Sequence, residues 1–551
     1  MTDIEIPYEN DRHGWYRVFE VLPGALSWLV LLLPVGLSFV TVTINDNNVN
    51  LGVVFILAYI LVYFVRSIGY SVRAVQGYRT MQIHKQLNWR AMLADIEAGS
   101  PTNEDIIRPK WHISNLARRP NFTRVYNPSE LVHAVIIATV NESREVLEPT
   151  IQSVLDNDFD PQQLILVLAY EGRAGQEAES RVQELVRLYG PRFKHAMAVK
   201  HPANIAGEIV GKGSNITYGG RELQRYLEKK KIDPANVIVT TLDADNRPDR
   251  QYFAAVSYLF CMVPEPLKAS YQPLPMFTNN IWDAPTLMRV IATGNTLFYI
   301  VGTQRPHRAR NFSAHAQSMQ ALIDMDFWSV RTIVEDGHHF WRSYFHFDGD
   351  YRVYPLSIPV YQDAVLADGY LKTMRAQFIQ LRRWTYGASD VAYVAYKGFF
   401  TKNKAWKPDI LAKFLVLLEG HITWATGTIL VLAASRVPVL IAPQSVGAIQ
   451  LPGLVSAVQT IGITGLLVSV YVCMVTLPPR PARYKRHRSV LMMVQWVLAP
   501  ISAVCFGSLA AFNSQTRLMF KRYLSKFDVT EKARVAESGE RISTEADPGQ
   551  N

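Results

Sequence analysis

Long apolar runs at the two ends of the chain constrain its fold more than any other feature. Two of them, Ala25 to Ile44 and Leu51 to Val65, contain no charged residue, and a short Asn-rich connection joins them. A helix of about 20 apolar residues crosses a bilayer, and the second run reaches that length if Arg66 snorkels to the interface. The pattern predicts that residues 1–70 form an N-terminal tail and a two-helix transmembrane hairpin.

Further apolar regions follow residue 400. Ile410 to Ala434 and Leu454 to Leu477 predict two more spans. The first contains polar residues that are costly in lipid, so we expect them to face the bundle interior, a channel or the interface. They are Lys413, Glu419 and His421. Pro500 breaks the last region, Val490 to Phe512, and the sequence leaves open whether this region crosses, re-enters or lies along the membrane.

The basic residues predict the orientation of these spans. The connection over 45–50 has no Lys or Arg, whereas Arg66, Arg73 and Arg79 follow the second span. Basic residues concentrate on the cytoplasmic side, so the central region is expected to be cytosolic in a multi-pass protein of a bacterial plasma membrane. A second basic stretch, 480–488, agrees with this. Membrane lipids account for much of the net charge of +10, and we expect no nucleic-acid partner.

The region between the spans alternates strand and helix patterns. Leu131 to Val140 and Leu164 to Leu168 are short apolar runs typical of buried strands, and Glu145 to Leu155 between them has helical spacing. This alternation predicts an α/β domain with a parallel sheet. The expected divisions are the hairpin over 1–70, a cytosolic connector over 71–130, the α/β domain over 131–400, transmembrane and interfacial helices over 401–525, and a terminal segment over 526–551 with a disordered end.

An Asp-x-Asp motif ends another apolar strand, Val237 to Leu242. It places Asp243 and Asp245 at the strand tip, and ligands of open α/β sheets collect beyond the carboxyl ends of such strands. Mg²⁺ and Mn²⁺ take oxygen ligands and share them with substrate phosphates. The motif therefore indicates a site for Mg²⁺ or Mn²⁺, although most Asp-x-Asp sequences are only turns or caps.

Two later motifs strengthen this interpretation. Glu335 and Asp336 form an acidic pair, and either carboxylate is suited to accept a proton from a hydroxyl group, although acidic residues also favour helix N-termini. The third motif combines an amide, a guanidinium and an indole in Gln380, Arg383 and Trp384. Arginine binds phosphate oxygens in pairs, and an indole face packs against a sugar ring, although an Arg/Trp pair also anchors helices at membrane interfaces.

The order Asp-x-Asp, Glu-Asp, Gln-x-x-Arg-Trp resembles the membrane-integrated family 2 glycosyltransferases, which include the cellulose, hyaluronan and chitin synthases. The resemblance covers about Leu131 to Gly387. It implies a cytosolic GT-A fold, a Rossmann-like nucleotide-sugar domain, with a donor that is commonly a UDP-sugar. It further implies Asp245 and Asp243 on the metal, Asp336 as general base beside Glu335, Arg383 on the diphosphate, and Gln380 and Trp384 at the acceptor.

Weaker matches extend the resemblance. They imply donor-site roles for Glu142, Glu171 and Lys212, and a gating segment containing Phe527, Val529, Thr530 and Lys532. Val140 and Glu171 replace a tyrosine and an aspartate of the family pattern, which puts the base-recognition pocket and uridine itself in doubt.

Three functions remain open at this level. The chain extends a polysaccharide, transfers one sugar to a lipid acceptor, or binds a nucleotide sugar as a membrane scaffold without turnover. The FDVTEK segment at 527–532 and the polar residues of the third span favour a polymer. The acidic residues and Arg383 argue against an inactive scaffold.

Overall fold

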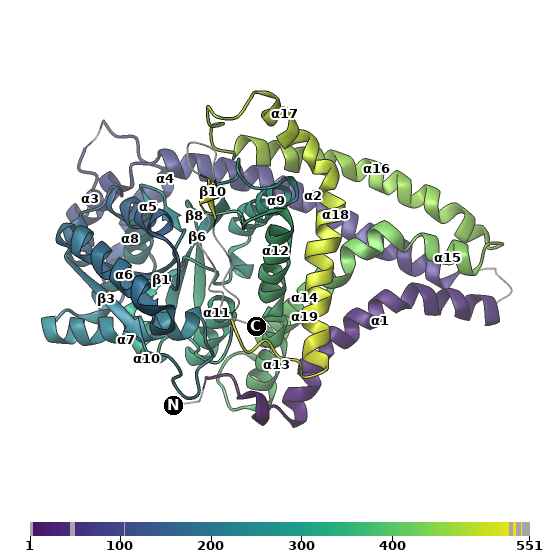
Figure 1. Ribbon diagram of the computed structural model, residues 1–551, viewed down its shortest axis with the longest axis horizontal. Helices are drawn as coiled ribbons and strands as arrows, with labels where there is room; N and C mark the ends of the chain where they lie inside the picture. Colours follow the sequence, from purple (N-terminus) through teal and green to yellow (C-terminus); the bar gives the residue numbers. More distant parts are fainter. Residues whose placement is uncertain (1–3, 45–49, 104, 528–532, 536–540, 543–551) are drawn as a thin grey trace.

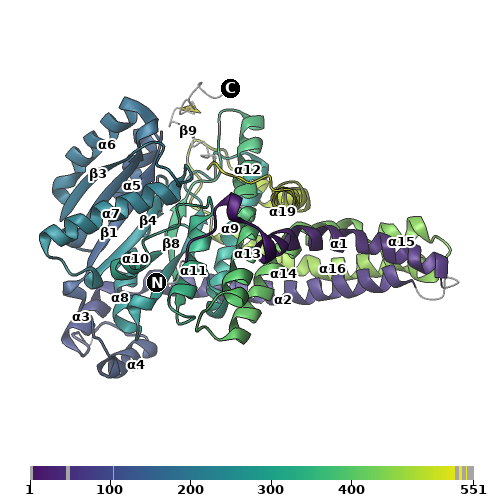
Figure 2. The same cartoon turned by 90° about the horizontal axis from the view of Figure 1, so that it is seen from below.

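A computed structural model describes residues 4–44, 50–103, 105–527, 533–535 and 541–542. It shows an α/β domain from which a bundle of long helices extends (Figures 1 and 2). The α/β fold class expected from the sequence is confirmed, and so are the flanking apolar helices.

The domain is built on an eight-stranded sheet in the order β3-β2-β1-β4-β7-β6-β8-β5. The first four strands in this order are parallel, and β7 is antiparallel to both β4 and β6. The strands are β1 (Val132–Thr139), β2 (Leu164–Glu171), β3 (His195–His201), β4 (Val237–Asp243), β5 (Arg247–Pro248), β6 (Ala269–Phe277), β7 (Ala316–Ser318) and β8 (Arg352–Gln362). The parallel half is the Rossmann-like part expected of a GT-A domain, and the carboxyl ends of its strands share one edge.

Helices cover both faces of the parallel half. On one face, apolar side chains of α5, α6 and α8 pack against alternate residues of β1 and β2, and on the other face α7 and α10 pack against the remaining ones. These helices are α5 (Arg144–Leu155), α6 (Gly175–Tyr189), α7 (Lys212–Lys230), α8 (Tyr252–Met262) and α10 (Met319–Asp324). Burial on both faces explains why these strands read as continuous apolar runs.

Four long helices form the bundle, which extends away from the sheet (Figure 2). They are α1 (Gly14–Ile44), α2 (Leu51–Gln86), α14 (Lys407–Ala433) and α16 (Val446–Val475), and each is long and apolar enough to cross a membrane. Glu419, a polar residue of the third span, pairs with Arg66 of α2. Helix α2 continues without a break past residue 70 to Gln86, so it joins the bundle directly to the α/β domain.

A fifth apolar stretch, His487–Met519, is also long enough to cross a membrane by length and composition. It contains α17 (His487–Val494), α18 (Ala499–Ser502) and α19 (Leu509–Met519), which are joined by 3₁₀ and π turns. In Figure 1 this stretch runs crosswise to α1, α2 and α16, past the base of the bundle. Of the alternatives that the sequence leaves open, this direction favours a helix along the membrane surface.

The segment before α1 is part of the α/β domain. Ile6 is 1% exposed, and Glu5 pairs with the buried Arg342 of α11 (Glu335–His346). The hydroxyl of Tyr393 donates a hydrogen bond to the carbonyl of Ile4 at 2.6 Å. Thus the N-terminal tail contacts the helix that carries the acidic motif.

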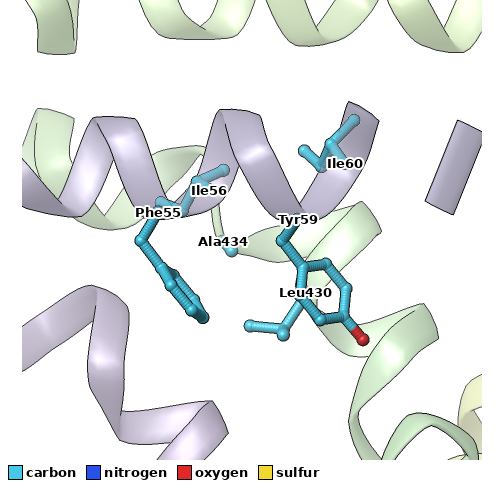
Figure 3. Close-up of a pocket in the computed structure, with 6 residues that line it drawn as sticks. All are labelled: Phe55, Ile56, Tyr59, Ile60, Leu430 and Ala434. Atoms are coloured by element: carbon cyan, nitrogen blue, oxygen red, sulfur yellow. The ribbon is translucent and has the colours of Figure 1, made fainter. Parts of the chain in front are cut away.

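Figure 3 shows the apolar seam between α2 and α14. Its lining comes from Phe55, Ile56, Tyr59 and Ile60 on α2 and from Leu430 and Ala434 at the end of α14. Such a lining suits helix packing and offers no group for a nucleotide or a metal ion. The polar chemistry is therefore sought at the edge of the sheet.

The contact between α2 and α9 (Thr286–Thr303) gives a stability prediction. A Cβ atom at Gly77 would lie 2.4 Å from the backbone oxygen of Ile300, so Gly77→Ala must push the two helices apart. Overpacking of this kind costs about 1–3 kcal/mol, and a thermal-unfolding measurement should show a clear drop in Tm. Gly294→Ala on α9 is the control, because a Cβ atom added there would have no neighbour within 4 Å. Equal effects of the two substitutions would contradict the close packing.

Candidate active site

The site lies where the carboxyl ends of β1, β2 and β4 meet the N-termini of α7 and α11. Asp243 is the last residue of β4, Lys212 is the first residue of α7, and Glu335 and Asp336 begin α11. Asp243 and Glu335, which lie about ninety positions apart in the sequence, are thereby brought together. The acidic residues at the start of α11 also complement the positive end of that helix.

The ammonium group of Lys212 joins the first two acidic motifs. Its Nζ atom lies 2.9 Å from Oδ1 of Asp243 and 3.1 Å from Oδ2 of Asp336. Oε1 of Glu335 is 3.8 Å from the same atom, and the lysine side chain is only 7% exposed. Three carboxylates thus surround one buried cation, and this arrangement fixes the Asp-x-Asp motif relative to the acidic pair.

Glycines allow this approach at two points. A Cβ atom at position 213 would lie 2.6 Å from the backbone oxygen of Ser329 and 3.1 Å from Cβ of Glu335. A Cβ atom at position 211 would lie 2.9 Å from Cβ of Phe527. The glycines on either side of Lys212 therefore let the start of α7 come close to α11 on one side and to the C-terminal segment on the other.

Burial distinguishes the two residues of the acidic pair. Burial and the neighbouring Asp336 carboxylate raise the pKa of Glu335 to about 8, although Lys212 and Arg383 act in the opposite direction. Asp336 is more accessible, since its side chain is 20% exposed and that of Glu335 only 3%. Burial alone lowers the pKa of Lys212, but the three carboxylates outweigh it, and the net pKa is raised. The lysine therefore stays charged, and Asp336 is the better placed of the two acids to meet a substrate.

The two aspartates of the Asp-x-Asp motif have different partners. Asp243 accepts a hydrogen bond of 2.7 Å from the hydroxyl of Ser313, and its side chain is 33% exposed. Asp245 is 6% exposed and accepts a 2.9 Å bond from the backbone N–H of Asp363, just after β8. Asp243 thus faces the open side of the site, whereas Asp245 lies against the end of β8.

The donor set at this point suits a hard divalent cation. Mg²⁺ is usually bound by one or two carboxylates together with substrate phosphates, and Asp243 and Asp245 supply two. Among the residues that the structure describes, no group of three or more His, Cys, Asp or Glu side chains converges to hold a metal. For such a cation, water and substrate phosphates usually supply the remaining ligands.

A buried aromatic layer lies behind Asp336. The indole N–H of Trp328 donates to Nε2 of His315 at 3.3 Å, which leaves Nδ1 of this histidine as the donor to the backbone oxygen of Phe312 at 2.9 Å. The same Nδ1 atom is 4.0 Å from Oδ1 of Asp336. Burial lowers the pKa of His315, so the ring is neutral and packs beside Asp336 without competing with Lys212 for its charge.

His338 and His339, which follow the acidic pair after Gly337, are fully buried. Nδ1 of His338 contacts Oδ1 of Asp390 at 2.7 Å, and Nε2 of His339 contacts the side-chain oxygen of Gln317. Both side chains fasten α11 to its neighbours.

The third motif lies on α12 (Tyr370–Thr385). Trp384 packs on Phe277 at the end of β6, with ring centroids 5.9 Å apart, and Gln380 accepts a 3.0 Å hydrogen bond from Gln377. The guanidinium of Arg383 is close enough to Glu335 to act on its pKa. The motif therefore borders the acidic site.

The start of the expected gating segment reaches the same place. The ring centroid of Phe527 lies 3.9 Å from the guanidinium carbon of Arg383. The backbone N–H of Phe527 donates to the backbone oxygen of Val210 at 3.1 Å. Val529, Thr530 and Lys532 lie outside the described residues. On their far side, the N–H of Ala533 donates to the backbone oxygen of Leu366 at 2.9 Å.

The expected donor-site acids lie at the ends of β1 and β2. Glu142 accepts hydrogen bonds from the hydroxyl of Thr139 and the N–H of Val140, so it shapes the turn after β1. Glu171, the last residue of β2, is 3% exposed and lies 3.3 Å from Nδ1 of His201. The structure brings both acids to the edge that carries Lys212, but it gives Glu171 a histidine partner that the sequence did not suggest.

His201 bridges two acids, because its Nε2 lies 3.0 Å from Oε2 of Glu208. It therefore fastens the segment before Lys212 to the ends of β2 and β3. Sequence reasoning missed His201 and Glu208, although their position shortly before Lys212 is a usable signal. Ser313 and Asp363, the partners of Asp243 and Asp245, carry no such signal, because only the sheet order brings them to this edge.

Comparisons with known proteins give distant structural similarities. Neither a family model nor a curated protein sequence matches the chain. A mannosyltransferase from Pyrobaculum calidifontis, solved with GDP-Man and Mn²⁺, is 14% identical over 79% of this chain and 99% of its own, with a TM-score of 0.36. S. aureus TarS 1-349 in complex with UDP-GlcNAc is 12% identical over 76% of this chain and 98% of its own, with a TM-score of 0.34. At these scores the similarities carry no functional argument.

The buried histidine gives a pH prediction. Burial alone would lower the pKa of His201, but Glu171 and Glu208 raise it to about 9, above the ordinary value of 6.5. Its contribution to stability is therefore complete below about pH 6.5 and is lost as the pH rises through 9. We expect His201→Gln to cost on the order of 2 kcal/mol at pH 6 and little at pH 10, as measured by thermal unfolding across this range. A cost that does not change with pH would contradict a charged His201.

Proposed function

We propose that the chain is an inverting glycosyltransferase of the membrane-integrated family 2 type, with a GT-A domain in the cytosol. It transfers a sugar from a nucleotide-sugar donor, expected to be a UDP-sugar, to a growing polysaccharide at the membrane face. The observation that carries the proposal is the convergence of three motifs on one sheet edge, with Lys212 between Asp243 and Asp336. A purely structural ion-pair network would explain why Lys212 is buried among acids, but it would not explain why Arg383 and Trp384 adjoin the same site.

The proposed donor site uses charge complementarity. Asp243 and Asp245 would hold Mg²⁺ or Mn²⁺ together with the donor diphosphate, and a cation held there would neutralise charge on the leaving group. Lys212 and Arg383 provide positive charge at the same edge of the sheet. Glu142 and Glu171 lie at the β1 and β2 ends, where the nucleoside is expected to bind.

The proposed acceptor site lies on the other side of the acidic pair. Asp336 takes the proton from the acceptor hydroxyl as that oxygen attacks the anomeric carbon from the face opposite the leaving group. Gln380 and Trp384 bind the acceptor sugar, with the indole packed against the ring. Glu335 is held neutral by burial, so it adds no second negative charge near the leaving diphosphate.

The polymer is favoured over a single-sugar lipid product by one specific feature. The chain after α19 returns to the site, where Phe527 packs on Arg383 and Ala533 bonds to the loop after β8. Contacts of the C-terminal chain with Arg383 and with the loop after β8 suit an enzyme that repeats the cycle on one acceptor. Transfer of one sugar to a lipid acceptor is the alternative, because α12 packs directly on α19 of the crosswise membrane helix.

Turnover by the purified full chain in nanodiscs tests the proposal. A panel of UDP- and GDP-sugars with Mg²⁺ or Mn²⁺ is followed by nucleotide release and product size. Release with one donor and a high-molecular-weight product is expected. A lipid carrying one sugar would replace the polymer with the alternative, and binding without release would make the chain a scaffold.

Asp336→Asn should abolish transfer while the protein still folds, because an amide cannot accept the proton of the acceptor. The loss in kcat should be at least about 10²-fold, with little change in donor binding. Asp326→Asn is the matched control, since Asp326 is 75% exposed and its positive φ of 54° suits asparagine equally well. Near-normal turnover of Asp336→Asn would remove this residue from the mechanism.

Lys212→Met separates two proposed roles of the lysine, which are to neutralise the surrounding carboxylates and to provide positive charge for the donor. The substitution leaves the surrounding carboxylates without their cation, so it should increase Mn²⁺ affinity in the absence of donor. It should also reduce kcat/KM for the donor by about 10²-fold, since one preorganised positive charge is lost. Titration of Mn²⁺ and steady-state kinetics measure the two effects. A fall in donor-free Mn²⁺ affinity would show that the lysine does not compete with the metal.

A further inference from the structure

Arginines from two elements meet beside the membrane bundle, away from the active site. Helix α2 packs closely on α9, where Gly77 meets the backbone of Ile300 and Ala74 shares a core with Val301. Arg73 lies one turn before Gly77 on α2, and the turn after α9 carries Arg305 and Arg308. We call these three residues the arginine cluster.

The cluster has an excess of positive charge. In the part of the chain that the structure describes, no carboxylate lies within 4.0 Å of a guanidinium nitrogen of Arg73, Arg305 or Arg308. Arg73 donates only to a backbone oxygen of its own helix, that of Gly69 at 2.8 Å. The nearby Arg66 is already paired with Glu419. Burial and repulsion from Arg73 and Arg308 lower the pKa of Arg305, so an anion at this point would relieve the repulsion.

The surroundings of the cluster are apolar and exposed. Ile68 and Val72 on α2 are 51% and 52% exposed, and Phe298 on α9 is 55% exposed. Gly294 and Gly302 share the Phe298 face of α9, and a Cβ atom added at either would have no neighbour within 4 Å, so this face is open. Exposed aromatic and aliphatic side chains beside arginines are typical of the headgroup level of a membrane.

The level of the cluster along the bundle agrees with this. Ser71, next to Val72, donates to the backbone oxygen of Gly465 on α16 at 3.4 Å, and beyond this point α2 becomes polar, with Arg73, Arg79 and Lys85 before its end at Gln86. Helix α2 continues from the bundle to the α/β domain (Figure 1). The arginines therefore lie between the proposed membrane and the sheet.

We infer that Arg73, Arg305 and Arg308 form a binding site for the phosphate group of an anionic membrane lipid. The inference rests on the proposed membrane placement, but not on the proposed chemistry. Guanidinium groups bind phosphate oxygens through paired donors, and acyl chains of the same lipid would cover Phe298, Ile68 and Val72. A lipid bound here joins α2 to α9 at the point where the bundle meets the α/β domain.

Native mass spectrometry of the full chain in detergent tests the site, with phosphatidylglycerol and phosphatidylcholine titrated separately. Wild type should bind phosphatidylglycerol at least tenfold more tightly than phosphatidylcholine. At about fivefold per arginine, Arg305→Gln with Arg308→Gln should weaken phosphatidylglycerol binding by about 25-fold. Arg308→Gln alone keeps the test valid if the double variant does not fold, because Arg308 is exposed.

Two controls separate a defined site from other sources of the signal. Arg486→Gln removes an exposed arginine from the other basic stretch at the bundle, and it should leave binding unchanged. An equal loss in Arg486→Gln would show diffuse attraction and overturn the site. Displacement of the lipid by millimolar inorganic phosphate would also overturn it, because the ligand would then be free phosphate. Equal binding of phosphatidylglycerol and phosphatidylcholine would overturn the site as well. None of these outcomes depends on sugar transfer.

Discussion

The position of one buried ammonium group determines the geometry of the whole site. Lys212 is held against Asp243 and Asp336, which begin or end different elements, so the sheet and two helix N-termini must meet within one ion-pair distance. The carboxylates of Asp243 and Asp336, both within about 3 Å of this group, would repel each other without a cation. The flanking glycines at 211 and 213 are the steric condition for this contact, since a side chain at either position would collide with its neighbour. The proposed donor and acceptor sites both depend on it.

Both ends of the chain help to hold this arrangement. Glu5 pairs with Arg342 on the helix that begins with the acidic pair, and Phe527 packs between Gly211 and Arg383. The long apolar helices are therefore tied to the candidate site, because the segments that precede α1 and follow α19 pack against it. The crosswise stretch 487–519 lies on α12, which carries Gln380, Arg383 and Trp384, and so joins the apolar helices to the third motif.

Sequence patterns predicted the elements better than their contacts. The apolar runs at β1, β2 and β4 gave strands close to the observed ones, because burial on both faces leaves a composition that can be read locally. The Asp-x-Asp motif was found because it ends such a run, and the Glu-Asp pair because it follows that motif in the order of a known family. The pairing of Glu171 with His201 and of Asp245 with the backbone of Asp363 depends on strand order, which local patterns do not encode. The direction of stretch 487–519 likewise depends on packing against α12 and α14.

The central claim is that Asp243 and Asp245 form a divalent-cation site that a nucleotide diphosphate completes. Electron paramagnetic resonance of Mn²⁺ with the full chain, with and without UDP, tests it directly. We expect one tightly bound Mn²⁺ that requires UDP, and its loss in the double variant Asp243→Asn, Asp245→Asn. Mn²⁺ binding that is indifferent to UDP, or that survives in the double variant, would contradict the account.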